Sequence, residues 1–241
     1  MKDSEAKTEV LLERHREVWD HSQPFLDQRN GGLALRTYRA VTWLHRARDE
    51  PGDHFAAFLL YWVAFNALYG ALPAEPDARE RKAWRSYFER LLANDRARRS
   101  IHDVLRRLER PIAVLMTDEL AYPPTLRPGS GFADGLDRGA GRVRQALKST
   151  TGTDFVLLEV FSRLYNVRNW LIHGRIAWKS RIMGDCVTAG TDVMTRLIPA
   201  LVEVMLGEAW PDEWEEPRYS PDVYEGTTTP KEIPAIGGGL E

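Results

Sequence analysis

The stretch from Leu164 to Arg175, LYNVRNWLIHGR, combines side chains that can bind an anion and move protons. Arg168 carries a permanent positive charge, and Asn169 beside it can hydrogen-bond to a neighbour or a ligand. His173 follows five residues after Arg168, and histidine is the usual general acid or base near neutral pH. These three residues are therefore candidates for a catalytic group that stabilises developing negative charge and transfers protons.

Arg168 lies on the apolar stripe of a helix that we predict over residues 154–173. It follows Phe161 by seven residues and Leu164 by four, which is the spacing of one helical face. An unpaired buried guanidinium costs several kcal/mol. We therefore expect either a buried partner for Arg168 or a stripe that faces something other than the core.

A second stripe of the same helix is polar, because Asn166, Asn169 and His173 recur at i, i+3 and i+7. Gly174 is a natural residue to follow the helix end, which would leave the imidazole of His173 accessible. A purely structural interpretation stays open, since a histidine can cap a helix and an arginine can extend from an apolar stripe to solvent.

The elements that must position these residues are helices. Helical periodicity dominates and the alternation typical of strands is scarce, so the fold class is all-α. Pro51-Gly52 predicts a tight turn and an antiparallel hairpin. We expect residues 118–135 to form a long loop. Residues 1–206 are expected to form one helical domain, followed by an acidic extended tail over 207–241. The helices are expected at 5–22, 31–49, 53–71, 77–94, 97–117, 138–149, 154–173 and 181–206.

Bulk composition excludes several classes of protein. The chain has 241 residues, 43% of them hydrophobic and 28% charged, with a formal net charge of −2. The charged N-terminus does not resemble a signal peptide, and no apolar run approaches the roughly 20 residues of a membrane span, so we expect a cytoplasmic protein with no membrane contact. Cys186 is the only cysteine, which excludes internal disulfides and thiolate metal clusters.

Charge is distributed unevenly along the chain. Residues 79–110 carry 11 Lys or Arg against 5 Asp or Glu, and residues 207–241 carry 2 against 9. The basic run is either an ordinary solvated helical surface or a face that attracts phosphate, with the acidic tail shielding it or competing for it.

Other signals for chemistry are weak. The glycines of residues 129–135 lack the strand and the spacing of a dinucleotide-binding loop. His15 and His21 would lie far apart around a helix, so we expect no metal site and no cofactor. Asn66 interrupts an apolar run, where we interpret it as a satisfied core amide.

Two segments together resemble the HEPN superfamily of prokaryotic helical domains, and in particular its Apea-like members. They are FLLYWVAFNALYG, from Phe58 to Gly70, and VRNWLIHG, from Val167 to Gly174. The shared mark of that superfamily is Arg, a polar residue, further residues and then His. The resemblance covers residues 31–71 and 154–206, and it treats residues 72–153 as a helical insertion without a family counterpart.

The resemblance implies an antiparallel helical bundle and metal-independent cleavage of RNA by a homodimer. Arg168, Asn169 and His173 would be the catalytic residues, with Asn169 orienting His173 or contacting the phosphate. The two motif helices would meet across a twofold axis. On this interpretation Arg168 lies on an apolar face because a second subunit shares that face. Tyr165, Asn166 and Arg175 are candidate RNA contacts, although packing is the favoured role for Tyr165.

Two other functions stay open. The chain could be a non-catalytic HEPN-like module that binds RNA or nucleotide, or that only dimerises. It could also be a toxin, or an effector of defence against phage, that an antitoxin or regulatory partner restrains. Family members restrained by a nucleotidyltransferase carry Tyr two residues after the motif His, where this chain has Arg175, and this difference argues against modification by that route.

Overall fold

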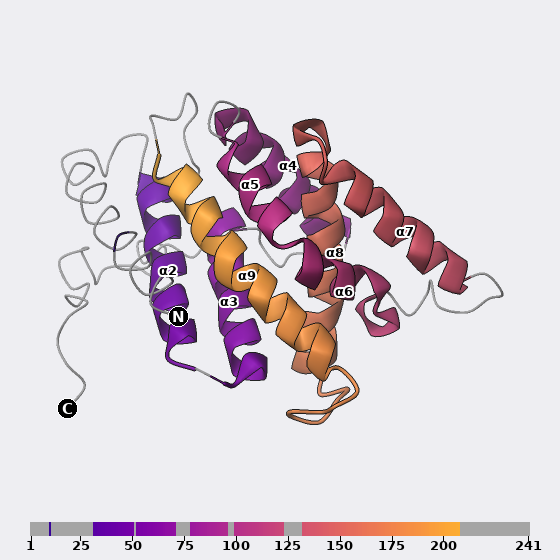
Figure 1. The fold of residues 1–241 in the computed structure, drawn as a ribbon. Helices are drawn as coiled ribbons and strands as arrows, with labels where there is room; N and C mark the ends of the chain where they lie inside the picture. Colours follow the sequence, from indigo (N-terminus) through magenta and orange to yellow (C-terminus); the bar gives the residue numbers. More distant parts are fainter. Residues whose placement is uncertain are drawn as a thin grey trace, which may run out of the picture.

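The computed structural model of the chain describes Val10 and residues 31–50, 52–70, 78–95, 99–122 and 132–207. Within these ranges all regular structure is helical, which confirms the all-α class (Figure 1). The helix expected over 5–22, part of the 118–135 loop and nearly all of the acidic tail lie outside the described residues.

Eight α-helices and two short 3₁₀ turns make up the described part of the chain. Five of the helices, α2, α3, α4, α8 and α9, match the expected ranges to within three residues at each end. The elements are α2 (Gly31–Arg48), α3 (His54–Tyr69), α4 (Ala78–Asp95), α5 (Ser100–Arg107), α6 (Glu109–Thr117), η2 (Glu119–Ala121), α7 (Phe132–Ala146), η4 (Thr150–Gly152), α8 (Thr153–Ile172) and α9 (Gly184–Met205).

Helices α2 and α3 form the expected antiparallel hairpin (Figure 1). Gly52 has a φ of 88°, a conformation that other residues rarely adopt, so it allows the tight turn. Asp53 then caps α3, because its carboxylate accepts hydrogen bonds from the backbone N–H groups of Phe55 and Ala56.

The helix expected over 97–117 is in fact two helices that meet at Leu108, where φ is −100° and ψ is 12°. Pro111 explains this break. A proline ring clashes with the carbonyl four residues earlier, here that of Arg107, and it has no N–H to donate. Because α6 begins at Glu109, Pro111 lies in its first turn, where no N–H is required.

Helix α7 begins at Phe132, six residues before its expected start. The first residues of α7 belong to the Pro- and Gly-rich stretch 118–135 that we expected to be a loop, because glycine and proline weaken helices. The structure gives a reason for Gly139: a Cβ there would lie 3.1 Å from the Tyr122 hydroxyl, so the glycine allows close approach.

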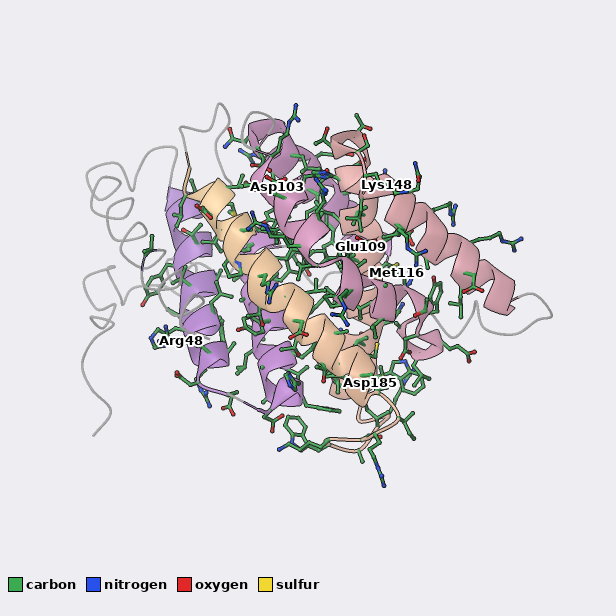
Figure 2. The ribbon with its side chains drawn as sticks, in the orientation of Figure 1. Arg48, Asp103, Glu109, Met116, Lys148 and Asp185 are labelled. Carbon is green, nitrogen blue, oxygen red and sulfur yellow. The ribbon has the colours of Figure 1, made fainter. Side chains whose placement is uncertain are left out.

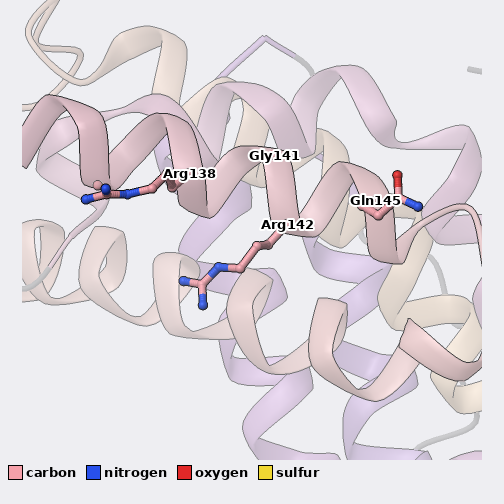
Figure 3. A pocket seen from close by; sticks show the side chains of 5 residues that line it. Arg138, Gly141, Arg142 and Gln145 are labelled. Atoms are coloured by element: carbon pink, nitrogen blue, oxygen red, sulfur yellow. The ribbon is translucent and has the colours of Figure 1, made fainter.

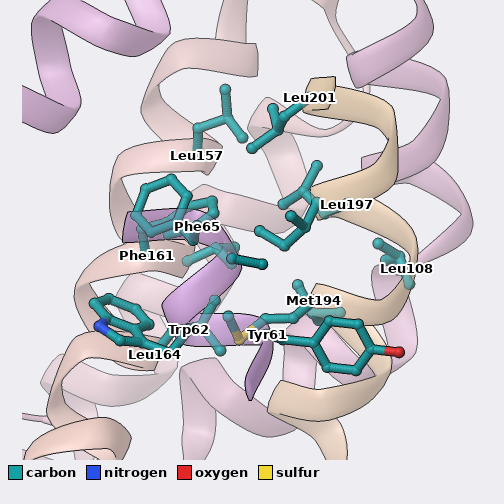
Figure 4. Close-up of a cluster of buried hydrophobic side chains, with 14 of the residues drawn as sticks. Tyr61, Trp62, Phe65, Leu108, Leu157, Phe161, Leu164, Met194, Leu197 and Leu201 are labelled. Atoms are coloured by element: carbon teal, nitrogen blue, oxygen red, sulfur yellow. The ribbon is translucent and has the colours of Figure 1, made fainter. Parts of the chain in front are cut away.

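The helices share one hydrophobic core, and α3 runs through it. Figure 4 shows Trp62 and Phe65 of α3 beside Phe161 and Leu164 of α8, with leucines of α9 facing them. Phe65 is completely buried, and its ring centroid lies 4.1 Å from that of Phe161. This aromatic packing fixes α8, the helix that carries Arg168 and His173, against the centre of the fold.

The segment treated as an insertion, residues 72–153, supplies α4, α5, α6 and α7. Within its described residues these helices pack against α8 and α9 and contribute to the same core. The segment therefore forms part of the support of α8. None of the described helices combines the length and the apolar composition that spanning a bilayer requires.

Candidate functional site

The C-terminal end of α8 is closed by the expected glycine. Gly174 has a φ of 61°. Its N–H donates to the Leu171 carbonyl, and the Arg175 N–H donates to the Trp170 carbonyl, which together form a Schellman motif. Non-glycine residues pay an energetic cost at this φ, so Gly174 is suited to ending the helix directly after His173.

His173 is the C-cap residue of α8, and its side chain is exposed. Its backbone N–H bonds to the Asn169 carbonyl, while its imidazole makes no hydrogen bond to any described residue. An imidazole in this position can reach a ligand from solvent without breaking an internal contact.

Arg168 is half-buried at the same end of α8. Its Nη1 donates to Asn169 Oδ1 at 2.9 Å, and its guanidinium carbon lies 5.7 Å from the centre of the Tyr165 ring. Its Nε is buried and has no hydrogen-bond partner among the described residues. The permanent positive charge of this guanidinium, held by Asn169 beside an exposed helix end, can attract an anionic ligand.

Asn169 orients Arg168 in this structure, whereas we expected it to orient His173 or to contact a phosphate. Its carbonyl oxygen accepts the Arg168 hydrogen bond. Its amide N–H groups make no bond to the described residues and are available to a ligand.

The stripe that carries Arg168 faces the core of its own chain. Phe161 and Leu164 are 0% exposed in one copy of the protein, so this part of the stripe is covered without a second subunit. Partly exposed apolar residues of α8 include Phe155, Leu158 and Ile172, and Ile172, four residues after Arg168, continues the same stripe where it emerges from the core. A contact between two copies through α8 would use these partly exposed residues, the last of which, Ile172, directly precedes His173.

Asn166 is buried, whereas Asn169 is half-buried and His173 is exposed. Asn166 is 7% exposed, and its amide nitrogen donates to the Ala121 carbonyl at 2.9 Å. One turn later, Trp170 Nε1 donates to the Leu120 carbonyl at 3.0 Å. The two side chains attach the η2 turn to α8, so Asn166 as placed here has a structural role, where the sequence suggested an RNA contact.

Replacing Asn166 with Ala is expected to lower the free energy of unfolding by about 1–3 kcal/mol, because the buried Ala121 carbonyl would lose its donor. Urea unfolding followed by circular dichroism measures this loss. Asn169→Ala is the matched control on the same helix and should change the free energy by less than about 1 kcal/mol, since the Asn169 side chain is only half-buried. Equal stability of the two variants would contradict the role assigned to Asn166.

Tyr165 and Arg175 occupy different environments. Tyr165 is 6% exposed, and its ring centroid lies 5.3 Å from that of Trp84 and 6.0 Å from that of Trp62. It therefore has the packing role that the sequence favoured. Arg175 is exposed, and its guanidinium carbon lies 5.8 Å from the centre of the Trp170 ring. Arg175 therefore joins the exposed end of α8, whereas Tyr165 supports it from within.

Sequence reasoning missed a second arginine on α8. Arg163 is 6% exposed, donates to Glu159 Oε2 at 3.0 Å and stacks 3.7 Å from the centre of the Tyr122 ring. The Tyr122 hydroxyl donates in turn to the Met116 carbonyl. The Glu159 and Arg163 spacing of i and i+4 was visible in the sequence, but the Tyr122 contact joins segments 41 residues apart and was not.

Other chemistries have little support in the described residues. Burial raises the pKa of the Cys186 thiol, and the nearby Asp118 carboxylate raises it further, so Cys186 stays protonated and is a poor nucleophile. No group of three or more His, Cys, Asp or Glu side chains in the described ranges could hold a metal ion. A shallow hollow on α7 is lined by Arg138, Arg142 and Gln145 with two glycines (Figure 3), but all of these residues belong to one helix.

Comparisons of the chain with protein-family models, with curated proteins and with solved structures give no match. The functional interpretation therefore depends on the end of α8 and its surroundings.

Proposed function

We propose that the chain is a metal-independent endoribonuclease of HEPN type that acts as a homodimer in the cytoplasm. The observation that carries the proposal is the end of α8. There an exposed imidazole, His173, follows a half-buried guanidinium, Arg168, whose Nη1 is held by Asn169.

The residue types suit internal transesterification of RNA. The ribose 2′-oxygen attacks the adjacent phosphorus, the bond from phosphorus to the 5′-oxygen breaks, and no water or metal ion is consumed. One proton must leave the 2′-hydroxyl and one must reach the departing 5′-oxygen. A histidine can do either, and two copies of His173 in a dimer would supply the base and the acid. Arg168 would stabilise the negative charge that develops on the phosphate oxygens.

The apolar residues that α8 leaves partly exposed are suited to contact a second copy of the chain. They include Phe155, Leu158 and Ile172, of which Ile172 is 50% exposed. Burying such side chains between two copies is favourable, and a twofold contact near Ile172 would bring the two His173 residues toward one cleft. The family resemblance adds growth arrest or defence against phage as the setting, with an antitoxin as a candidate partner.

Cleavage in EDTA tests the proposal. The full chain is expected to cut transfer RNA or structured messenger RNA without divalent ions and to leave 2′,3′-cyclic or 3′-phosphate and 5′-hydroxyl ends, which mass spectrometry identifies. The matched substrate has 2′-deoxyribose throughout and should resist cleavage, because it lacks the nucleophile. A requirement for magnesium, or 5′-phosphate ends, would show that the mechanism is wrong. Binding without cleavage would favour the non-catalytic module.

A further inference from the structure

The loop between α8 and α9, residues 173–183, is cationic and exposes large apolar side chains in the residues that follow His173. It contains Arg175, Lys179 and Arg181 and no Asp or Glu. Trp178 is 54% exposed and Ile182 is 75% exposed. Figure 1 shows this loop extending below the bundle, and Figure 2 shows its side chains projecting beside Asp185. We call residues 173–183 the α8–α9 loop.

The α8–α9 loop is held in place by its own contacts. Met183 is completely buried, and Ile176 packs against the core. Lys179, at a φ of 57°, brings its Nζ within 3.3 Å of Asp53 Oδ2 at the start of α3. Because the loop is already ordered, a ligand that binds it would pay little of the entropy that immobilising a free loop costs.

Trp178 is only partly used by the fold. Its ring centroid lies 5.6 Å from that of Phe55, so the indole covers part of the buried Phe55 ring. More than half of the side chain is nevertheless exposed. A fixed aromatic surface of this kind can accept a flat ring by stacking.

The charges around Trp178 select the kind of ligand. Lys179 is paired with Asp53, which leaves Arg175 and Arg181 as the exposed cations on either side of the indole in the chain. Exposed arginines interleaved with an aromatic ring form the usual recognition pattern for a single strand of nucleic acid, in which bases stack and phosphates meet guanidinium groups.

We infer that the α8–α9 loop binds unpaired RNA, with a base stacked on Trp178 and the flanking phosphates at Arg175 and Arg181. The inference rests on the proposed function for its ligand and deepens it, because it makes unpaired segments the substrate class. A paired base cannot expose its face to the indole, so duplex RNA is excluded from this surface. The strand would lead directly to His173, two residues before Arg175.

The binding test uses a labelled 2′-O-methyl oligonucleotide, which cannot undergo attack by the 2′-oxygen, and fluorescence anisotropy in EDTA. Trp178→Ala is expected to weaken binding of the single strand roughly tenfold, the effect of losing one stacked base. Trp178→Phe should retain most of the affinity, because it preserves a stacking ring. The matched control is Trp43→Ala, an exposed tryptophan on α2 that is 39% exposed and should not matter. The same oligonucleotide in a duplex should bind equally to wild type and to Trp178→Ala.

Salt dependence tests the phosphate contacts. For Arg181→Gln, the slope of log affinity against log salt should become shallower by about 0.7, the value for one phosphate contact on a single strand. An unchanged slope would overturn the role of Arg181. Equal affinities of Trp178→Ala and Trp43→Ala would overturn the stacking role. The stacking role would also be contradicted if Trp178→Ala changed the mass measured by light scattering but not the RNA affinity. The loop would then bind a second copy of the chain.

Failure of this inference and failure of the proposed function give different results. If binding depends on Trp178 but the protein cuts no RNA, the result supports RNA binding by the α8–α9 loop and contradicts the proposed nuclease function. If the protein cuts RNA but neither Trp178→Ala nor Arg181→Gln changes RNA binding, the result supports the nuclease function and contradicts RNA binding by the loop.

Discussion

His173→Ala is expected to reduce RNA cleavage in EDTA by about 100- to 10,000-fold, the usual contribution of a positioned general acid or base. The fold should persist, because the imidazole is exposed and makes no hydrogen bond to the described residues. Cleavage rates under single-turnover conditions measure the effect, and thermal unfolding and light scattering establish that the fold and the oligomeric state are unchanged.

The matched control for His173→Ala is His45→Ala. His45 lies on α2, where its partners are Arg48 of the same helix and Asp49, which directly follows that helix, so its removal should leave cleavage intact. Arg168→Lys is the companion variant and should lose most of the activity, because an ammonium lacks the planar fork that holds Asn169 and a phosphate together. Cleavage that survives in His173→Ala would remove His173 from the reaction.

Phe65→Ala is expected to lower the free energy of unfolding by about 3–5 kcal/mol, the cost of deleting a buried aromatic ring. Phe65 is completely buried. Its ring centroid lies 4.1 Å from that of Phe161 on α8, 4.8 Å from Tyr69 on α3 and 6.0 Å from Phe88 on α4. The deletion would open a cavity where three helices meet and would loosen the support of α8.

Urea unfolding measures the loss in Phe65→Ala, and Phe65→Leu should recover much of it by refilling the cavity. Trp43→Ala serves as the control, because this exposed ring on α2 should change the free energy far less. A loss below about 1 kcal/mol in Phe65→Ala would show that the aromatic cluster is not the centre of the core.

Part of the candidate site was predictable from the sequence. Gly174 after His173 indicated where α8 ends, and the Schellman motif confirms it. Asn66 was interpreted as a satisfied core amide; its Oδ1 does accept a hydrogen bond from the Tyr69 hydroxyl at 2.9 Å, but the residue is half-buried. These features are local, since every group involved lies within five residues of its partner.

The helix break at Leu108 could also have been read from the sequence. Pro111 excludes the bond that a continuous helix needs at this point, and the apolar periodicity of residues 97–117 concealed this local rule. The early start of α7 was harder to predict, because residues 132–137 follow a Pro- and Gly-rich stretch and contain Gly135.

By itself the sequence determined the all-α class, the five helices α2, α3, α4, α8 and α9, and the turn between α2 and α3, because periodicity, proline and glycine act within a few residues of themselves. Only the tertiary structure decided which stripe of α8 is internal. Asn166 and Asn169 are equally polar and one turn apart, yet one bonds the Ala121 carbonyl inside the protein and the other holds Arg168 at the exposed end. The physical reason is that periodicity shows which residues share a face, whereas the element packed against that face comes from dozens of residues away.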